Sequence, residues 1–244
     1  MISSRHRCLF VHVPKTAGMS IEHVFLGLLG LTWEGRAPLL LRANHDPRQG
    51  PPRLAHLTAA EYVSCGYLSA EQFESYFKFS FVRNPWDRMV SEYKYRGYPV
   101  KIDFKTYLFR RLPPPGWTDT YRHIMPQHDF LHDESGRLLV DFVGRYETLQ
   151  ADFDRVCARL DLPPTPLPRV NRSLEDRRPM SFRELRKRLR RAIHSRERRH
   201  TFPHYTEYYD QESREFVGRM FRRDVESFNY SFGDGVPSPA PASS

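Results

Sequence analysis

The sequence predicts an α/β domain in which helices flank a central parallel β-sheet. Two stretches carry this prediction. A buried strand, a tight loop and an amphipathic helix follow one another over Leu9–Leu29, and the same order returns over Phe77–Tyr93. Because parallel strands need a crossover that is usually a helix, repeated units of this kind are typical of a sheet between layers of helices. We therefore expect three layers.

The first unit contains a candidate anion site. Leu9–Val13 is a short apolar run that ends at Pro14, which has no N–H for a sheet ladder. A small polar loop, Lys15–Ser20, follows it. Apolar residues then recur at helical spacing, namely Ile21, Val24, Phe25, Leu28 and Leu29. Free N–H groups and the helix dipole favour an anion at such a helix start, and Lys15 adds a full positive charge.

The loop sequence PKTAGMS is not a Walker A motif, because Lys15 precedes Gly18 instead of following the last glycine. It resembles the 5′-phosphosulfate loop, P-K-T-[AG]-[GS]-T-S, of carbohydrate-type sulfotransferases that use 3′-phosphoadenosine-5′-phosphosulfate (PAPS). Met19 departs from the usual threonine and loses a hydroxyl contact. A lysine in an ordinary surface turn is the competing interpretation. The resemblance implies a P-loop-like fold and cofactor contacts from Lys15, Thr16, Ala17, Gly18, Met19 and Ser20.

The second unit contains a second phosphate motif. Phe77–Val82 alternates aromatic and polar residues, as a strand does. Asn84 suits an N-cap and Pro85 the first helical position, so Arg83 is expected at a strand end beside a helix N-terminus. Its guanidinium can grip a phosphate bidentately there. In the family, R-N-P-x-x-R-x-x-S is the 3′-phosphate site, and the match is complete. The resemblance implies that Arg83 and Ser91 bind that phosphate.

His56 is the candidate catalytic base. It stands just before a short helix predicted from the capping-box pair Thr58 and Glu61. Family members commonly place a catalytic histidine between the two cofactor motifs, and an ordinary histidine titrates at about 6.5. The resemblance assigns Lys15 to the charge on the leaving phosphate oxygen. Other candidates for the base stay open, namely Glu61, His123 and His128.

The remaining segments complete one predicted domain over residues 1–232. Leu138–Val143 is expected to be a third core strand. Asn171 and Ser173 match the N-x-[ST] loop with which the family closes over the nucleotide. A basic helical insertion is expected at about 174–202, and a disordered tail rich in Pro, Ser and Ala at 233–244.

The net charge of +9 is local. Residues 169–199 hold 13 Lys and Arg against 4 Asp and Glu, whereas the rest of the chain carries 25 of each sign. A basic helix in this segment is either a solvated face or a guide for an anionic acceptor, a nucleic acid or a membrane surface.

The cellular compartment is predicted from the cysteines and from hydropathy. Three widely spaced cysteines, Cys8, Cys65 and Cys157, predict neither a metal site nor a disulfide framework. Neither a secretory signal nor a membrane-spanning run is evident in the sequence. We expect a cytoplasmic protein, with peripheral membrane contact still compatible.

The two phosphate motifs together predict a PAPS-dependent sulfotransferase that acts on an acceptor hydroxyl. The motif style favours a glycan acceptor, which can be anionic, although lipids and small alcohols stay open. We expect no metal, because Lys15 can supply the positive charge that Mg²⁺ supplies in phosphoryl transfer. A nucleotide or sugar kinase is the first alternative, but its Walker lysine is missing. A non-catalytic nucleic-acid-binding module is the second, but it leaves both phosphate loops unexplained, so no nucleic-acid partner is expected.

Overall fold

A computed structural model describes residues 1–168 and 200–235. Asn171 and Ser173, most of the basic insertion and residues 236–244 of the tail lie outside the described residues.

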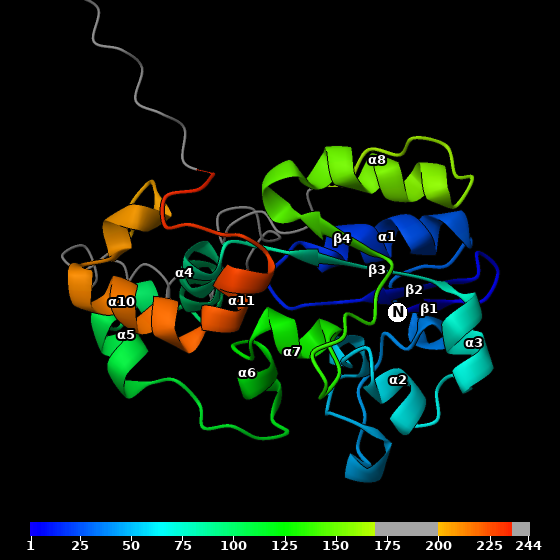
Figure 1. The fold of residues 1–244 in the computed structure, drawn as a ribbon, viewed down its shortest axis with the longest axis horizontal. Helices are drawn as coiled ribbons and strands as arrows, with labels where there is room; N and C mark the ends of the chain where they lie inside the picture. The colour runs from blue at the N-terminus through cyan, green and yellow to red at the C-terminus, as the bar shows by residue number, and fades with distance from the viewer. Residues whose placement is uncertain (169–199, 236–244) are drawn as a thin grey trace, which may run out of the picture.

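A four-stranded sheet runs through the middle of the molecule in the order β1-β2-β3-β4 (Figure 1). The strands are β1 (Ile2–Ser3), β2 (Cys8–Val11), β3 (Phe77–Val82) and β4 (Phe142–Arg145). β2, β3 and β4 are parallel, as the repeated strand–loop–helix units predict. β1 adds an antiparallel edge, so the sheet is mostly parallel.

The third core strand begins later than the sequence pattern predicts. The prediction was Leu138–Val143, but β4 spans Phe142–Arg145. Its register explains the difference, because Phe142 pairs with Phe79 and β3 begins only at Phe77. The residues before Val140 therefore have no strand beside them, and Leu138 makes an isolated bridge instead.

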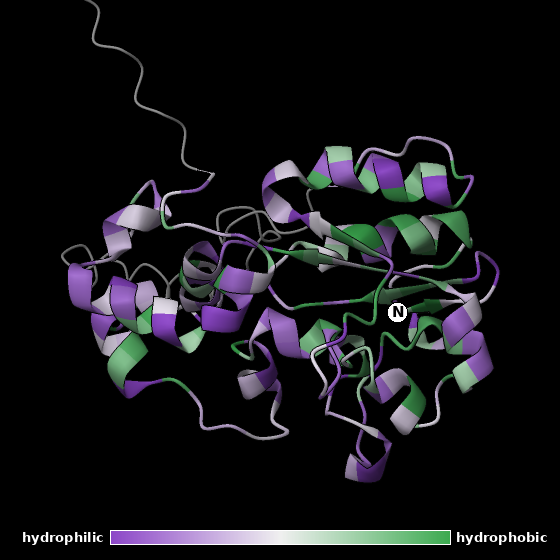
Figure 2. Cartoon of the chain, in the orientation of Figure 1, coloured by the Kyte–Doolittle hydropathy of each residue, from purple (hydrophilic) through white to green (hydrophobic). Residues whose placement is uncertain are grey.

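Helices cover both faces of the sheet, and the alternating side chains of β2 show why (Figures 1 and 2). Cys8 and Phe10 pack in a cluster with residues of α1 (Gly18–Leu28) and α8 (Leu149–Arg159). Leu9 and Val11 point to the other face, toward α2 (Glu61–Ser64), α3 (Ala70–Ser75) and α7 (Gln127–Leu131). In Figure 2, α1 is largely green, as expected of a helix packed on the strands, whereas α3 and α8 also carry purple, hydrophilic residues.

A third cluster lies beyond the end of the sheet, around the buried ring of Tyr93. It joins α4 (Pro85–Tyr95) to α5 (Phe104–Arg110), α10 (Gln211–Met220) and α11 (Arg222–Ser227). The helix α6 (Asp119–Arg122) lies below α7 in Figure 1. Short 3₁₀ turns occupy Ala37–Leu39, Pro47–Gln49, Leu54–His56, Tyr98–Val100, Tyr146–Thr148 and Tyr205–Tyr208.

The predicted start of α4 is confirmed, and the predicted Thr58–Glu61 contacts form, although α2 itself begins only at Glu61. The side chain of Asn84 caps α4 by accepting hydrogen bonds from the N–H groups of Trp86 and Asp87, and Pro85 is the first helical residue. Thr58 and Glu61 make both hydrogen bonds of the predicted pair, at 3.3 and 2.8 Å. These caps fix the direction in which the chain leaves β3 and the segment after His56.

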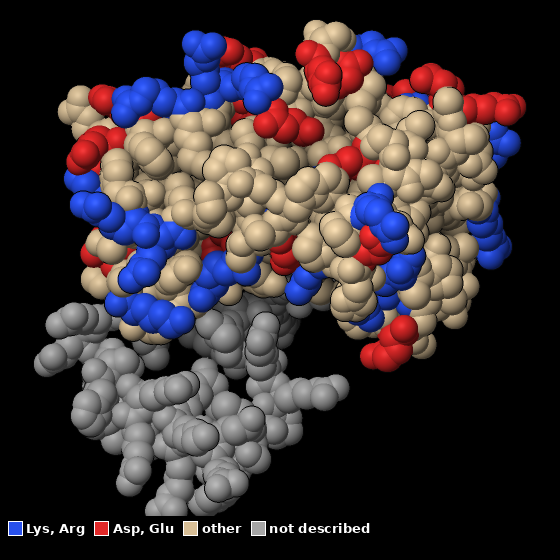
Figure 3. Space-filling view, turned by 90° about the horizontal axis from the view of Figure 1, so that it is seen from below, with Lys and Arg blue, Asp and Glu red and all other residues tan. Residues whose placement is uncertain are grey.

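Charges of both signs lie around the rim of the face in Figure 3, and the middle of that face is largely uncharged. This agrees with the balanced charge outside residues 169–199. Among the described residues, no helix is long and apolar enough to cross a membrane.

Candidate active site

The loop between β2 and α1 has the backbone geometry of an anion site. Lys15 and Ala17 adopt left-handed backbone angles, with φ of 73° and 67°. Such angles cost a residue other than glycine about 1–3 kcal/mol and tend to occur at functional sites. Ala17 is the N-cap of α1 and offers no side-chain cap. The backbone N–H groups of Thr16, Ala17 and Gly18 donate no hydrogen bond to another described residue, so they are available to an anionic ligand.

Two small residues, Gly18 and Thr16, set the shape of this loop. A Cβ atom at Gly18 would overlap the ring of His12, so only glycine fits beside that histidine. The buried hydroxyl of Thr16 donates to the carbonyl oxygen of Val13 at 2.8 Å. The Thr16 hydroxyl therefore holds the loop itself. The predicted cofactor contacts of Thr16, Met19 and Ser20 stay predictions, and the N–H of Ser20 is bonded to Ala17.

Lys15 lies among cations. Its Nζ lies 3.8 Å from the centre of the Tyr95 ring, which is 52% exposed. Burial lowers the pKa of Lys15 to about 8; Glu92 opposes this shift, and Arg83, Arg96 and Arg88 add to it. A buried ammonium group that faces other cations gains much from an anionic ligand.

Arg83, from the second predicted phosphate motif, contacts Lys15, from the first. It leaves the end of β3, and its Nη1 donates to the carbonyl oxygen of Lys15 at 3.2 Å across 68 positions of sequence. Its Nε and Nη2 contact Asp87 at 2.8 and 2.7 Å, and the guanidinium lies 3.9 Å from the centre of the Tyr146 ring. Ser91 is half-buried farther along α4, and its hydroxyl makes no hydrogen bond to another described residue.

Arg88, to which the sequence analysis assigned no role, ties the two loops to a third segment. Its side chain is 1% exposed. It donates to the carbonyl oxygens of Pro14, Met125 and His123 at 3.0, 2.9 and 3.1 Å. Burial lowers its pKa to about 10, so it stays charged at neutral pH. Arg88 therefore fixes the loop between β2 and α1 against the segment that carries His123.

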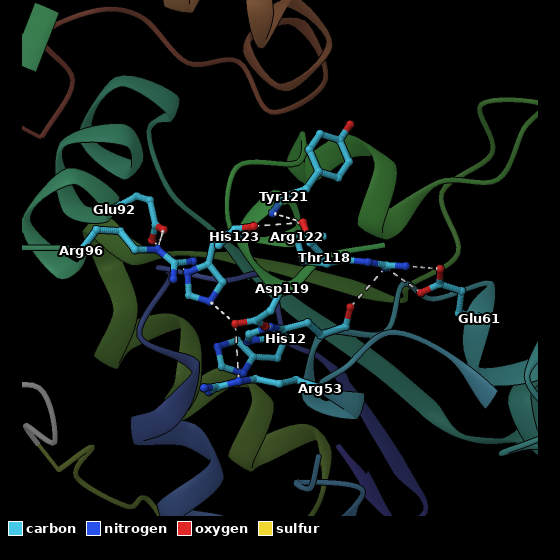
Figure 4. Close-up of polar contacts among 12 residues, drawn as sticks. His12, Arg53, Glu61, Glu92, Arg96, Thr118, Asp119, Tyr121, Arg122 and His123 are labelled. Carbon is cyan, nitrogen blue, oxygen red and sulfur yellow. Dashed lines mark hydrogen bonds and ion pairs between the residues drawn. The ribbon is translucent and has the colours of Figure 1, made fainter. Parts of the chain in front are cut away.

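Three histidines meet beside this loop, and each donates from Nδ1 to a carboxylate. Figure 4 shows two of them, His12 and His123, on either side of Asp119. The pairs are His12–Glu22 at 2.6 Å, His56–Asp119 at 3.0 Å and His123–Glu92 at 2.8 Å. The His56 ring meets the other two edge to face, at 5.4 Å from His12 and 5.0 Å from His123. An ionised carboxylate only accepts hydrogen bonds, so Nδ1 is the nitrogen that carries a proton in each of these three contacts.

His56 is the central ring of this group and is 6% exposed. Burial lowers its pKa to about 4, against the opposing effect of its hydrogen bond to Asp119. Burial works against ionisation of Asp119, yet the contact with His56 and the nearby His123 and Arg53 bring its pKa down to about 2. At neutral pH His56 is thus an uncharged imidazole held by a carboxylate, which is the state that a general base requires.

Tyr95 joins the three histidines to the loop that carries Lys15. The Tyr95 ring stacks on His123, with 5.4 Å between centroids, and also covers Lys15 Nζ. His12 lies only two residues before Pro14 and touches His56. Among the described residues, His56, Asp119 and His123 also have donor atoms within 4.8 Å of one another, which is close enough for a cation.

The rival candidates for the base lie in less suitable surroundings. Glu61 forms a double ion pair with Arg122, at 2.6 and 2.7 Å, and also accepts from the N–H of Thr58. Both of its oxygens therefore serve a structural contact. His128 lies on α7 and stacks against His132 at 3.9 Å. His123 belongs to the same group as His56, but its Nε2 is buried without a hydrogen-bond partner among the described residues.

Comparison with known proteins gives the family. The family model described as "Sulfotransferase family" matches residues 1–231. The chain belongs to the sulfotransferase family. The mouse protein named carbohydrate sulfotransferase 14 is 27% identical over 195 residues, which are 67% of this chain and 47% of that protein. Carbohydrate sulfotransferase 10 of Xenopus laevis is 31% identical over 94 residues, or 38% of this chain and 24% of its own length.

A third relative is an uncharacterized protein of Archaeoglobus fulgidus, 30% identical over 105 residues, which are 43% of this sulfotransferase and 83% of that protein. No solved structure matches this sulfotransferase. The matches to carbohydrate sulfotransferase 14 span about half the length of that protein, 47% in both the mouse and the human form.

Proposed function

We propose that this sulfotransferase moves the sulfuryl group of PAPS to an acceptor hydroxyl, using a P-loop-like site at the start of α1. The contact between the two predicted phosphate motifs carries the proposal, because Arg83 Nη1 reaches the carbonyl oxygen of Lys15 at 3.2 Å. Two cationic side chains at neighbouring helix N-termini suit a nucleotide with phosphates at two positions.

The donors in this region fit such a nucleotide. The backbone N–H groups of Thr16, Ala17 and Gly18 donate to no other described residue, and the α1 start carries no side-chain cap. Lys15 and Arg83 supply full positive charges beside them. PAPS, when bound, supplies the sulfuryl group and a phosphate leaving group.

Two side chains of this chain would carry the chemistry. The Lys15 ammonium, buried among other cations, would stabilise negative charge on a phosphate oxygen. His56 is neutral at pH 7, so its Nε2 would accept the proton of the acceptor hydroxyl. The positive charge of Lys15 replaces that of a metal in this proposal.

The acceptor proposed is a glycan, which can be anionic. Two relatives carry the name carbohydrate sulfotransferase, which supports a carbohydrate acceptor. A pocket of about 110 Å³ opens beside Glu92, which holds His123, and it is lined in part by Arg96, Arg111 and Thr120. The two guanidinium groups that line this pocket suit an acidic sugar. The cytoplasmic location of the enzyme stays a prediction.

A transfer screen tests the proposal. Labelled PAPS is offered with glycans, lipids and small alcohols to the wild-type enzyme and to Lys15→Ala, in EDTA. We expect label on a glycan with the wild type, near-complete loss with Lys15→Ala, and no effect of EDTA. Transfer by Lys15→Ala within tenfold of wild type contradicts the role of Lys15. A strict Mg²⁺ requirement, with phosphate transfer from ATP, supports a kinase instead.

A further inference from the structure

Asp119 stands at a junction that the sequence motifs do not indicate. It is the first residue of α6, after the N-cap Thr118, and lies 63 positions from His56. Its Oδ1 accepts from His56 Nδ1 at 3.0 Å. Its Oδ2 lies 3.4 Å from Arg53 Nε and 3.8 Å from His123 Nε2 (Figure 4). One carboxylate therefore faces both His56 and His123.

The contact to His56 controls which ring nitrogen is basic. A free imidazole exchanges its proton between Nδ1 and Nε2, and only the nitrogen without the proton can act as a base. Because an ionised carboxylate accepts from Nδ1–H, Asp119 holds the tautomer in which Nε2 has the lone pair. Nε2 makes no hydrogen bond to another described residue, so it is the nitrogen left for a substrate proton.

We propose that Asp119 is the positioning residue of the base, holding His56 in the tautomer that accepts a proton at Nε2 and stabilising the imidazolium that results. This inference rests on the proposed function. In the transfer step the acceptor O–H bond breaks and its proton goes to His56 Nε2. The oxygen uses the freed electron pair to bond to sulfur, and the S–O bond to the phosphate breaks. The positive charge on His56 then lies 3.0 Å from Asp119.

His123 shares Asp119 and has the opposite effect on His56. Its Nδ1 is held by Glu92, and its Nε2 is buried, turned toward Asp119 and without a described partner. Positive charge on His123 opposes positive charge on His56, whereas Asp119 favours it.

Other charged groups also surround His56. His12 touches the ring from the end of β2 and lowers its pKa, with Glu22 behind it. Arg53 pairs with Asp119, and Arg122 donates to the His56 carbonyl oxygen. The His12–Glu22 pair and Arg122 make no contact with Asp119 or His123 through these bonds, so they are unchanged in both variants, whereas Asp119→Asn also removes the ion pair to Arg53.

Two variants test the inference by moving the pH profile in opposite directions. In Asp119→Asn the His56 pKa falls, so the acid limb of kcat/KM moves to lower pH while kcat drops by up to about 10²–10⁴. In His123→Asn a neighbouring positive charge is lost, so the acid limb moves to higher pH. The affinity for 3′-phosphoadenosine-5′-phosphate (PAP) stays within twofold of wild type in both. Asp46→Asn, in an exposed pair with Arg48, is the matched control and leaves all three quantities unchanged.

A measurement on the wild-type protein keeps the inference testable if Asp119→Asn does not fold. The ¹⁵N chemical shifts of the imidazole rings report which nitrogen carries the proton. We expect His56 to be protonated at Nδ1 at pH 7. A proton on Nε2 instead, or an Asp119→Asn enzyme with wild-type kcat and an unmoved acid limb, overturns the role of Asp119. If the wild type transfers no sulfate, the proposed function fails, and the ring shifts still decide this inference.

Discussion

The lowered pKa of Lys15 makes nucleotide binding depend on pH in a way that can be calculated. Burial brings that pKa to about 8. Lys15 is therefore about nine-tenths charged at pH 7, half charged at pH 8 and about one-tenth charged at pH 9. Only the charged form of Lys15 attracts a phosphate. The affinity is therefore highest below the pKa of Lys15 and falls as the pH rises through that pKa.

The expected magnitude follows directly. If the charged form alone binds PAP, the apparent Kd rises about twofold from pH 7 to pH 8 and about tenfold from pH 7 to pH 9. Phosphate groups have their second pKa near about 6, so the ligand does not titrate in this range. Isothermal titration calorimetry of PAP in buffers from pH 7.0 to 9.5 measures the Kd values.

Two substitutions of the same residue serve as controls. Arginine stays charged throughout this range, so Lys15→Arg should bind PAP with a Kd that does not change between pH 7.0 and 9.5. Lys15→Ala should bind weakly at every pH. A wild-type Kd that stays constant up to pH 9.5, or a Lys15→Ala variant with the same pH dependence as wild type, refutes the assignment of this titration to Lys15.

Three further substitutions test single contacts. His56→Ala should lower kcat by about 10²–10⁴ in steady-state assays while PAP binding is kept, and an unchanged kcat excludes it as the base. Gly18→Ala should lower the unfolding free energy by about 1–3 kcal/mol, because its Cβ would overlap His12. Gly27→Ala on the same helix, where nothing lies within 4 Å, is the control and should not destabilise; equal urea midpoints for the two variants refute the clash. Arg88→Met leaves three carbonyl oxygens without a donor and should cost more than about 3 kcal/mol; a urea midpoint near wild type shows that they are satisfied otherwise.

Local signals predicted the parts of the fold that local chemistry decides. The Asn84 cap and the Thr58–Glu61 pair lie where the sequence places them, whereas β2 ends at Val11, two residues before the end predicted from Pro14. The start of β4 could not be predicted this way. It depends on where β4 pairs with β3, and strand pairing is a tertiary property. The antiparallel β1 was missed because two residues carry no periodicity.

The same distinction between local signals and long-range contacts holds for the candidate site. The motifs pointed to Lys15 and Arg83, and the structure places them in contact. Asp119 and Arg88 received no role because their partners lie tens of positions away, at 63 residues for Asp119 and 74 for the Pro14 contact of Arg88. One feature of the sequence could have indicated the role of Arg88. An arginine in a helix that packs on a core needs buried hydrogen-bond acceptors.

The most direct test of the proposed function is whether the protein binds PAP more tightly than AMP, which lacks the 3′-phosphate. Calorimetry of both nucleotides at pH 7, in EDTA, with wild type and Arg83→Gln makes this comparison. The account predicts that wild type binds PAP more tightly by about 1.5–3 kcal/mol, roughly ten- to a hundredfold, because Arg83 adds a charge-assisted contact to the 3′-phosphate. It also predicts that Arg83→Gln loses most of this preference. Equal binding of PAP and AMP by the wild-type protein would contradict it.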